Sequence, residues 1–263
     1  MHVFDKDMGL DGNGEEGLKI TLTDGWSING NPNGGYLMAV LTVAMRQKSD
    51  KKWPSIITAN FMKKTALTQT VVPVECILQS TSFTRLQSSL IQDGIETVRA
   101  WGTFSDENVC LGESRYEQSE PEIASVETCF PIPLFGRYTL YKNMDVRLDP
   151  KCSGLFEGKL SPISEHKGWI SFKDERPVDA PALILMADAF PPPVLSSHGM
   201  VAWVPTVELS INVRSLPETK WVKACFKSRY ITCGLVEEDG ELWDEEGNLL
   251  AISRQIAQFR KST

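Results

Sequence analysis

The chain has 263 residues, of which 41% are hydrophobic and 23% charged, and its formal net charge is -7. This length fits one large domain or two ordinary ones, and the negative charge would repel a phosphate backbone, so we expect no nucleic-acid partner. No run approaches the ~20 apolar residues of a membrane span, and the acidic first residues are not typical of a signal peptide. We therefore expect a cytoplasmic protein.

The cysteines form no CxxC pair, and their spacing matches neither a zinc site nor a disulfide framework. We expect reduced cysteines, no metal site and no cofactor. The six positions are Cys76, Cys110, Cys129, Cys152, Cys225 and Cys233.

The first half of the chain predicts one strand, one helix and four further strands. Residues 17–23 favour a short strand, and the Gly- and Asn-rich loop that follows leads into an apolar, proline-free run at 34–47 that predicts a buried helix. The Asp93-Gly94 step indicates a tight hairpin turn. The four later strands are expected at 56–64, 71–83, 86–92 and 96–104.

A polar, acidic stretch with several prolines, from about 106 to 133, is typical of a crossing linker. The second half then repeats the first scheme, with a helix at 180–190. Its strands are expected at 138–147, 155–161, 168–173, 206–214, 221–232, 235–243 and 249–259. We therefore predict an N-terminal repeat at 1–110, a linker at 111–134 and a C-terminal repeat at 135–263.

The two halves can be overlaid in the same order. "YLMAV" at 36–40 lies over "ILMAD" at 184–188, "ITANF" at 57–61 over "LSINV" at 209–213, and "RAWGTF" at 99–104 over "RQIAQF" at 254–259. Coincidence among apolar runs is the alternative to a duplication. Both helices are apolar nearly all round, as a helix wrapped by a sheet should be. The pattern predicts an α+β double hot-dog fold, with two antiparallel sheets each wrapped around a central helix.

The stretch "LILMADAFPPP" at 183–193 places one carboxylate, Asp188, among apolar neighbours. An ionised group in such surroundings costs several kcal/mol unless it is paired or its pKa shifts. A catalytic carboxylate is one interpretation. A carboxylate that accepts hydrogen bonds from the backbone of the following loop is the other.

Three stretches resemble the thioesterase-like superfamily related to acyl-CoA thioesterase II (TesB-like): "WSINGNPNGGYLMAVL", "VPTVELSINVRS" and "GLVEEDGELWDEEGNLLAISRQIAQF". The resemblance implies a double hot dog, hydrolysis of acyl-CoA thioesters and a homo-oligomer. In that family a carboxylate, a hydroxyl residue and a glutamine hold the attacking water, and Asp188, Thr206 and Gln255 match these positions. The loop "NGNPNGGY" and the abrupt end of the second helix depart from the best-studied branch, so an acyl preference does not follow.

These residue types suit water attack on a thioester, which needs a proton acceptor and a donor for the developing oxyanion. Gly34 and Gly35 begin the first helix, where backbone N–H groups lack helical partners, so we predict an oxyanion donor there with Asn33 as the helix cap. A plain loop before a helix is the alternative. Under the overlay Asp188 lies over Val40 and Gln255 over Ala100, which predicts one site per chain.

Two other functions stay open: an enoyl-CoA hydratase-like enzyme, for which His198 would supply the histidine, and a protein that binds acyl-thioesters without turnover. No Ser-His-Asp order is evident. The phosphates of an acyl-CoA substrate would need basic residues at the entrance, and the candidates are Lys63, Lys64, Arg214, Lys227, Arg229 and Arg254.

Overall fold

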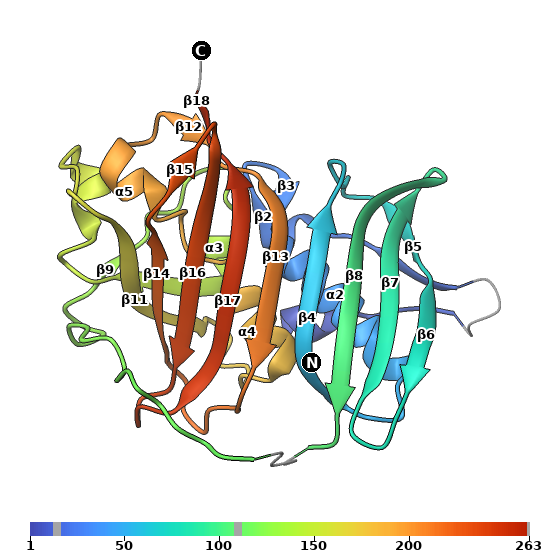
Figure 1. Ribbon diagram of the computed structural model, residues 1–263. Helices are drawn as coiled ribbons and strands as arrows, with labels where there is room; N and C mark the ends of the chain where they lie inside the picture. The colour runs from blue at the N-terminus through green and yellow to red at the C-terminus, as the bar shows by residue number, and fades with distance from the viewer. Residues whose placement is uncertain (13–16, 108–111, 262–263) are drawn as a thin grey trace.

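The computed structural model describes residues 1–12, 17–107 and 112–261 (Figure 1). In the first half the helices are α1 (Val3–Asp7), the 3-10 turn η1 (Asp24–Trp26) and α2 (Gly34–Lys48). The strands are β1 (Leu18–Thr21), β2 (Ser27–Ile28), β3 (Asn31–Pro32), β4 (Trp53–Phe61), β5 (Gln69–Val72), β6 (Val74–Gln79), β7 (Thr84–Gln92) and β8 (Ile95–Ser105).

In the second half the helices are α3 (Leu140–Asn143), the 3-10 turn η2 (Ser153–Glu157), α4 (Ala180–Met186) and α5 (Val194–His198). The strands are β9 (Phe130–Pro131), β10 (Met144–Leu148), β11 (Ser164–Phe172), β12 (Ala202–Trp203), β13 (Thr206–Val213), β14 (Val222–Ser228), β15 (Ile231–Thr232), β16 (Leu235–Trp243), β17 (Leu249–Gln258) and β18 (Arg260–Lys261).

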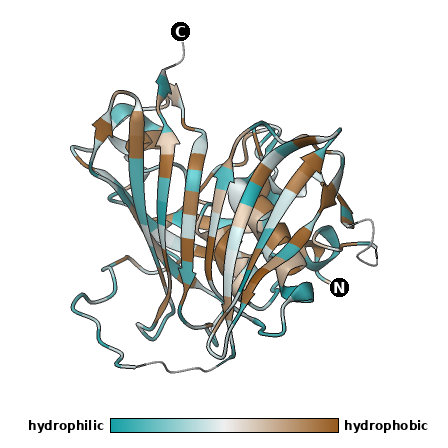
Figure 2. Ribbon diagram, turned by 45° about the vertical axis from the view of Figure 1, so that its right-hand side comes forward, coloured by the Kyte–Doolittle hydropathy of each residue, from teal (hydrophilic) through white to brown (hydrophobic). Residues whose placement is uncertain are grey.

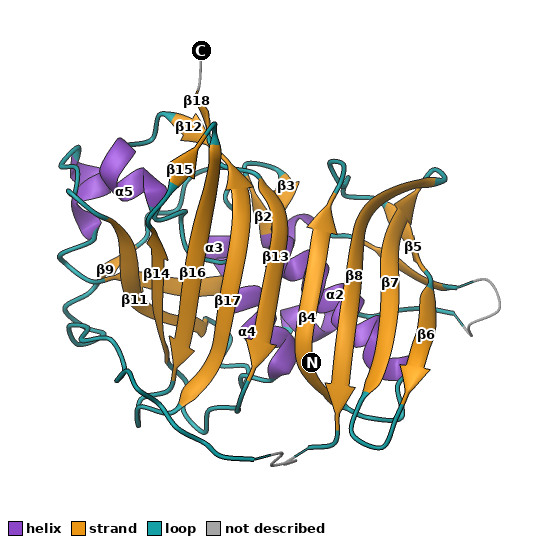
Figure 3. Cartoon of the chain, viewed as in Figure 1, coloured by secondary structure: helices purple, strands orange, loops and turns teal. Residues whose placement is uncertain are grey.

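The strands of both halves join into one 14-stranded antiparallel sheet. Its order is β1-β5-β7-β8-β4-β13-β17-β16-β14-β11-β10-β9, with β6 beside β7 and β15 beside β16. The helices α2 and α4 lie against the same side of this sheet and against each other (Figure 3). The predicted double hot-dog fold is confirmed. The strands of its two halves join at β4 and β13 into one continuous sheet.

Each strand buries one face, because successive side chains point to opposite sides of a sheet. Apolar and polar residues alternate along the strands (Figure 2). In β17, for example, Ala251, Gln255 and Ala257 are buried while Arg254 is exposed. The helix α2 is buried on nearly every side, from Gly35 to Met45, which is why its sequence shows no polar stripe.

The two halves are related by an approximate two-fold axis between β4 and β13. Thr58 of β4 pairs directly with Ser210 of β13, and their hydroxyl oxygens lie 2.8 Å apart. These two residues also lie over each other in the sequence overlay. An antiparallel pair in which equivalent residues face each other is the geometry of a two-fold contact.

The register of the other strands corrects the overlay at β17. In the first half, Ile57 pairs with Gly102, which pairs with Leu86. In the second half, Leu209 pairs with Gln255, which pairs with Glu238. Since Ile57 is the counterpart of Leu209, the counterpart of Gln255 is Gly102 and not Ala100. The sequence overlay is therefore displaced by two residues at β17. A displacement of two residues still matches inward-facing side chains with inward-facing ones.

Most predicted elements are confirmed with small changes at their ends. The Asp93-Gly94 turn has positive φ at both residues (50° and 74°), as a tight two-residue hairpin requires. The strand expected at 71–83 is divided at Pro73, which has no N–H to donate to a ladder. The short elements α1, α5, β2, β3, β9, β12 and β18 were not predicted.

Two strand predictions in the second half differ from the structure: the strand expected at 138–147 begins only at Met144, and the strand expected at 155–161 is not formed. Residues 138–147 contain α3 before β10, and Tyr141 of α3 stacks on Tyr138, which precedes the helix, with ring centroids 6.4 Å apart. Residues 155–161 contain the end of η2, which closes at Gly158 with φ 72°. In both places tertiary packing outweighs the β-propensity of aromatic and aliphatic residues.

Five cysteines are free thiols, namely Cys76, Cys129, Cys152, Cys225 and Cys233, and Cys110 lies outside the described residues. The domain boundary predicted after residue 110 also lies outside them. Within the described ranges, no helix is both long and apolar enough to cross a membrane. The same residues contain no group of three or more His, Cys, Asp and Glu side chains placed to hold a metal ion.

Candidate active site

Asp188 lies just beyond the end of α4, not inside the helix as the sequence predicted. The helix ends at Met186. Beyond it, Asp188 N and Ala189 N each bond to a carbonyl only three residues earlier, that of Leu185 and that of Met186. The chain cannot continue as a helix because Pro191 disfavours the helical conformation of the residue before it. This tightened turn projects the Asp188 side chain toward the start of α2.

The Asp188 carboxylate is held by the first turn of α2. Its Oδ2 atom accepts the Gly35 N–H at 2.9 Å and the Asn33 side-chain amide at 2.9 Å. The same Asn33 amide donates to the Asp188 carbonyl at 2.7 Å, and Asn33 Oδ1 caps α2 by accepting the Tyr36 N–H at 3.0 Å. The cap predicted from the sequence is confirmed, and its bridge to Asp188 is the part that the sequence did not show.

The glycine pair permits this close approach. A Cβ at Gly35 would lie 2.8 Å from the carbonyl oxygens of both Ile184 and Leu185, and a Cβ at Gly34 would lie 2.9 Å from Asp188 Oδ2. Backbone atoms at such distances cannot move aside without displacing one helix. Only glycine therefore lets the start of α2 contact the end of α4.

The environment raises the pKa of Asp188 to about 6, chiefly because burial disfavours the charged form. The N–H groups of Gly35 and Gly34 and the Asn33 amide oppose this effect by hydrogen bonding to the carboxylate. The positive end of the α2 dipole acts in the same direction. Asp188 is thus ionised only above about pH 6.

The structure gives the N–H groups of Gly34 and Gly35 a different acceptor from the oxyanion expected from the sequence. The sequence analysis assigned their N–H groups to an oxyanion, but the Gly35 N–H already donates to Asp188, and the Gly34 N–H also lowers the pKa of that carboxyl. The N-terminus of α2 binds an anion, as expected, but the anion is the Asp188 carboxylate of the protein itself.

Thr206 and Gln255 form a second polar group. Thr206 is the first residue of β13, at a bulge, and Gln255 is 5% exposed on the inner face of β17. The Gln255 amide donates from Nε2 to Thr206 Oγ1 at 2.8 Å. Because that hydroxyl oxygen accepts the bond, its own hydrogen is available to another acceptor.

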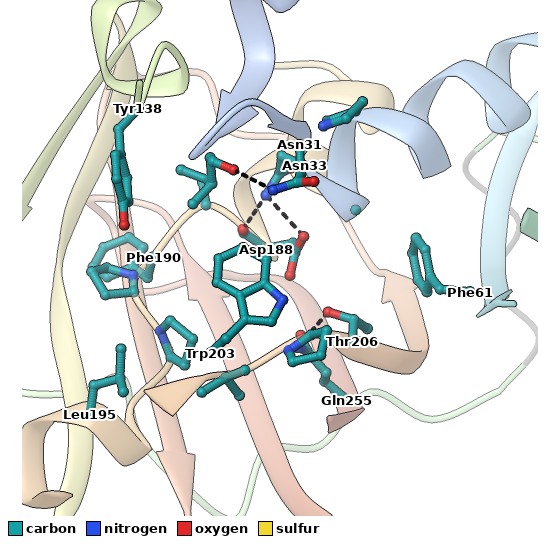
Figure 4. A pocket seen from close by; sticks show the side chains of 18 of the residues that line it. Asn31, Asn33, Phe61, Tyr138, Asp188, Phe190, Leu195, Trp203, Thr206 and Gln255 are labelled. Carbon is teal, nitrogen blue, oxygen red and sulfur yellow. Dashed lines mark hydrogen bonds between the residues drawn. The ribbon is translucent and has the colours of Figure 1, made fainter. Parts of the chain in front are cut away.

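Asp188, Thr206 and Gln255 line one cavity of about 610 Å³ (Figure 4). Among the described residues, no direct hydrogen bond joins Asp188 to Thr206 or Gln255. The two polar groups therefore meet only across the cavity, where a bound molecule has room to lie.

The cavity lies between the two halves of the chain, and most of its wall is apolar or aromatic. Pocket walls of this kind, with few polar groups, are typical of small-molecule sites. From the first half come Ile28, Leu37 and Phe61, and from the second half come Phe135, Tyr138, Tyr141, Phe156, Phe190, Leu195 and Trp203. The sequence analysis expected apolar contact between the halves but did not identify these aromatic residues.

Of the basic candidates for coenzyme A, Lys63 and Lys64 line the cavity, as does Arg260, which was not predicted. The other candidates are not among the cavity-lining residues. Lys227 forms an ion pair with Glu165, and both Arg229 and Arg254 form ion pairs with Asp239. Arg214 contacts Asn212.

The histidines are engaged outside the cavity. His198 Nδ1 contacts the Ser197 hydroxyl at 2.8 Å, and its ring packs edge-on against Phe259. His166 is fully buried, with Nδ1 against the Pro191 carbonyl at 2.9 Å, and burial lowers its pKa to about 4. Neither is among the residues that line the cavity.

Family comparisons agree with this architecture. Residues 119–259 match the family described as the acyl-CoA thioesterase C-terminal domain, and residues 22–105 match the acyl-CoA thioesterase N-terminal domain. The chain belongs to the acyl-CoA thioesterase family. The matched ranges coincide with the two halves of the sheet, so this thioesterase-family chain has both domains in one polypeptide.

Solved structures share this fold over nearly the whole chain. A protein described as a thioesterase II from Thermobifida fusca is 24% identical, with 99% of this chain and 98% of that chain covered and a TM-score of 0.89. A hot-dog protein of unknown function from Alicyclobacillus acidocaldarius is 19% identical over 100% of both chains, with a TM-score of 0.90. The acyl-CoA thioesterase II TesB2 from Mycobacterium marinum is 16% identical over 99% of both chains, with a TM-score of 0.76. No curated protein sequence matches the chain.

Proposed function

We propose that this chain hydrolyses acyl-CoA thioesters by direct attack of water. The observation that carries the proposal is the ionisable Asp188 carboxylate on the wall of a largely apolar cavity that also presents the Thr206–Gln255 pair. Membership of the acyl-CoA thioesterase family supports a thioester as the substrate.

In this proposal Asp188 is the general base. Its Oδ2 atom is fixed by Gly35 and Asn33, so Oδ1 is the atom that takes the proton of the water. The water oxygen bonds to the thioester carbon, the carbon–sulfur bond then breaks, and the leaving thiolate takes up a proton. A base with a pKa of about 6 is ionised at neutral pH and still accepts a proton readily.

Thr206 and Gln255 orient the water and stabilise the oxyanion. The hydroxyl hydrogen of Thr206 and the second amide hydrogen of Gln255 are both available, because their mutual bond uses only one donor. Donors fixed before the reaction stabilise developing charge without reorganisation. In this proposal Thr206 and Gln255 stabilise the oxyanion, the role that the sequence analysis expected of the Gly34 and Gly35 amides.

The acyl chain would lie against the aromatic wall between the halves, and the coenzyme A phosphates near Lys63, Lys64 and Arg260. One site per chain follows, because the first half has Gly102 and Leu86 where the second has Gln255 and Glu238. A homo-oligomer stays a prediction from the family resemblance.

The two alternatives are distinguished by the site. A hydratase would need a histidine beside Asp188, and no histidine lines the cavity within the described ranges. A binding protein without turnover would not need an ionisable carboxylate on the wall of the cavity.

The test is release of free thiol from a panel of short, long and aromatic acyl-CoAs, followed with a thiol-reactive dye. Wild type should release thiol from at least one class, and Asp188→Asn, which is nearly isosteric, should lower kcat by ~10²-fold or more. Ser88→Ala in the first half is the matched control and should keep wild-type kcat. Binding of acyl-CoA without release by wild type would favour the binding protein, and unchanged turnover in Asp188→Asn would remove the base.

A further inference from the structure

Glu238 is a second carboxyl group on the inner face of the second half. In β16 the buried residues Val236, Gly240 and Leu242 alternate with outward-facing acids. The Glu237 carboxylate accepts the backbone N–H groups of Arg229 and Tyr230, outside the core. Glu238 shares the face of Val236 and Leu242, so its carboxyl points toward the interior.

The strand register places Glu238 directly opposite Gln255. Residues opposite each other in antiparallel strands have Cβ atoms roughly 4.5–5.5 Å apart, which is within reach for a Glu and a Gln side chain. Gln255 donates from Nε2 to Thr206, and its carbonyl oxygen has no hydrogen-bond donor among the described residues. The Glu238 carboxyl likewise has no ion pair or hydrogen bond within these ranges.

The surroundings of Glu238 favour its neutral form. Burial raises its pKa well above the usual range, and the negative charge of Asp188 adds to this effect. Glu237 and Asp239 on the same strand raise it further, from the outer face. On the neighbouring strands Arg254 and Lys227 point outward to other acids, and His166 of β11 is uncharged at neutral pH.

The equivalent position in the first half is Leu86, which is fully buried. Its strand partner there is Gly102, the counterpart of Gln255. The carboxyl and the amide therefore occur together in the half that contains Asp188 and are both missing from the other half. This pairing indicates a shared role.

We propose that Glu238, in its protonated form, is a positioning residue that donates its O–H to the carbonyl oxygen of Gln255. This inference rests on the proposed function. The bond fixes which end of the Gln255 amide faces Thr206 and the cavity. An ionised Glu238 has no hydrogen to donate, and it would instead accept the Gln255 N–H group and turn the amide away from Thr206.

Activity measurements against pH test the proposal. The wild-type kcat should fall as rising pH ionises Glu238, and this fall should vanish in Glu238→Gln, whose amide still donates but does not titrate. Glu238→Leu, which copies Leu86, should lower kcat by ~10-fold across the pH range with little change in KM, the scale of one positioning hydrogen bond. Glu241→Gln, on the outer face of the same strand and not among the groups that raise the Glu238 pKa, is the matched control and should keep the wild-type profile. A fall with rising pH that persists in Glu238→Gln, or a wild-type kcat in Glu238→Leu, would overturn the role of Glu238.

Difference infrared spectroscopy gives a readout that does not need turnover. At a pH just above that at which Asp188 ionises, the wild type should show the carbonyl band of a protonated carboxyl. The band should persist in Asp188→Asn, vanish in Glu238→Gln and shift in Gln255→Leu. If no acyl-CoA is hydrolysed but this band behaves as described, the proposed function fails and the Glu238–Gln255 contact stands. An active enzyme without the band contradicts the Glu238 inference alone.

Discussion

The two halves of this chain share one architecture but differ along one row of inward-facing residues. In the first half the row is Ile57, Gly102 and Leu86, and a Cβ at Gly102 would lie 2.6 Å from the Phe104 ring and 2.8 Å from the Met45 sulfur. In the second half the row is Leu209, Gln255 and Glu238. The row in the first half is apolar and close-packed. The row in the second half contains the Gln255 amide and the Glu238 carboxyl.

Under the proposed function, this difference separates the residues that stabilise the core from those that take part in the chemistry. A buried polar group costs free energy unless it is hydrogen-bonded, whereas a close-packed apolar row stabilises the core. The first half therefore supplies the rigid support, including the α2 terminus that holds Asp188 through Gly35 and Asn33. The second half supplies the polar side chains of the site.

The largest expected effect comes from making the second half as apolar as the first. The double variant Thr206→Val with Gln255→Leu should lower kcat by on the order of 10²- to 10³-fold, because it removes preorganised donors. Its free energy of unfolding should fall by roughly 1–3 kcal/mol, because both partners of the Thr206–Gln255 bond are replaced together but the buried Glu238 carboxyl loses its proposed acceptor. Thiol release and denaturant titration measure the two quantities.

The control for that variant lies in the first half. Ser88 is buried and donates to the Pro73 carbonyl at 2.8 Å. Ser88→Ala should cost roughly 0.5–1.5 kcal/mol of stability without lowering kcat. An equal loss of kcat there would mean that the two halves do not divide their roles in this way.

The next effect concerns the contact between the halves. Gly35→Ala should reduce stability by roughly 1–3 kcal/mol and kcat by ~10²-fold, because the new Cβ pushes α2 away from α4 and misplaces Asp188. Gly136→Ala is the matched control, since a Cβ there meets no atom within 4 Å. Thermal unfolding and kinetics together check the prediction, and a wild-type melting temperature in Gly35→Ala would contradict the close approach.

A smaller effect should appear in the pH dependence. In the proposed mechanism Asp188 acts in its ionised form, so kcat/KM should rise with pH through about 6, before the fall expected when Glu238 ionises. Asn33→Ser keeps a good N-cap residue but removes the amide that stabilises the carboxylate, so the rise should move to higher pH. A rise at unchanged pH in that variant would show that Asn33 does not tune Asp188.

The smallest effect is expected at the two-fold contact itself. The Thr58–Ser210 bond lies on the outer face, away from the cavity. Thr58→Val, Ser210→Ala and the double variant form a double-mutant cycle whose coupling energy should be ~0.5–1.5 kcal/mol, with kcat unchanged. A coupling energy near zero would indicate that this pair adds nothing to the junction of the halves.

Much of the fold follows from local sequence patterns. The apolar run at 34–47 predicted α2 closely, and the Asp93-Gly94 step predicted its hairpin, because helical periodicity and turn conformation depend on near neighbours. The stacked pair Tyr138 and Tyr141 shows where this fails: the same residues suit a strand or a helical turn, and packing decides.

The sequence by itself determined that the chain has two buried helices, two sets of antiparallel strands and a single acid in the apolar run of the second helix. Only the tertiary structure decided that this acid meets Gly35, 153 positions away, and that Gln255 faces Glu238 inside and has Gly102 as its counterpart. Local periodicity gives the face on which a residue lies. It does not give its partner across the core, since that depends on how helices cross and how strands are registered.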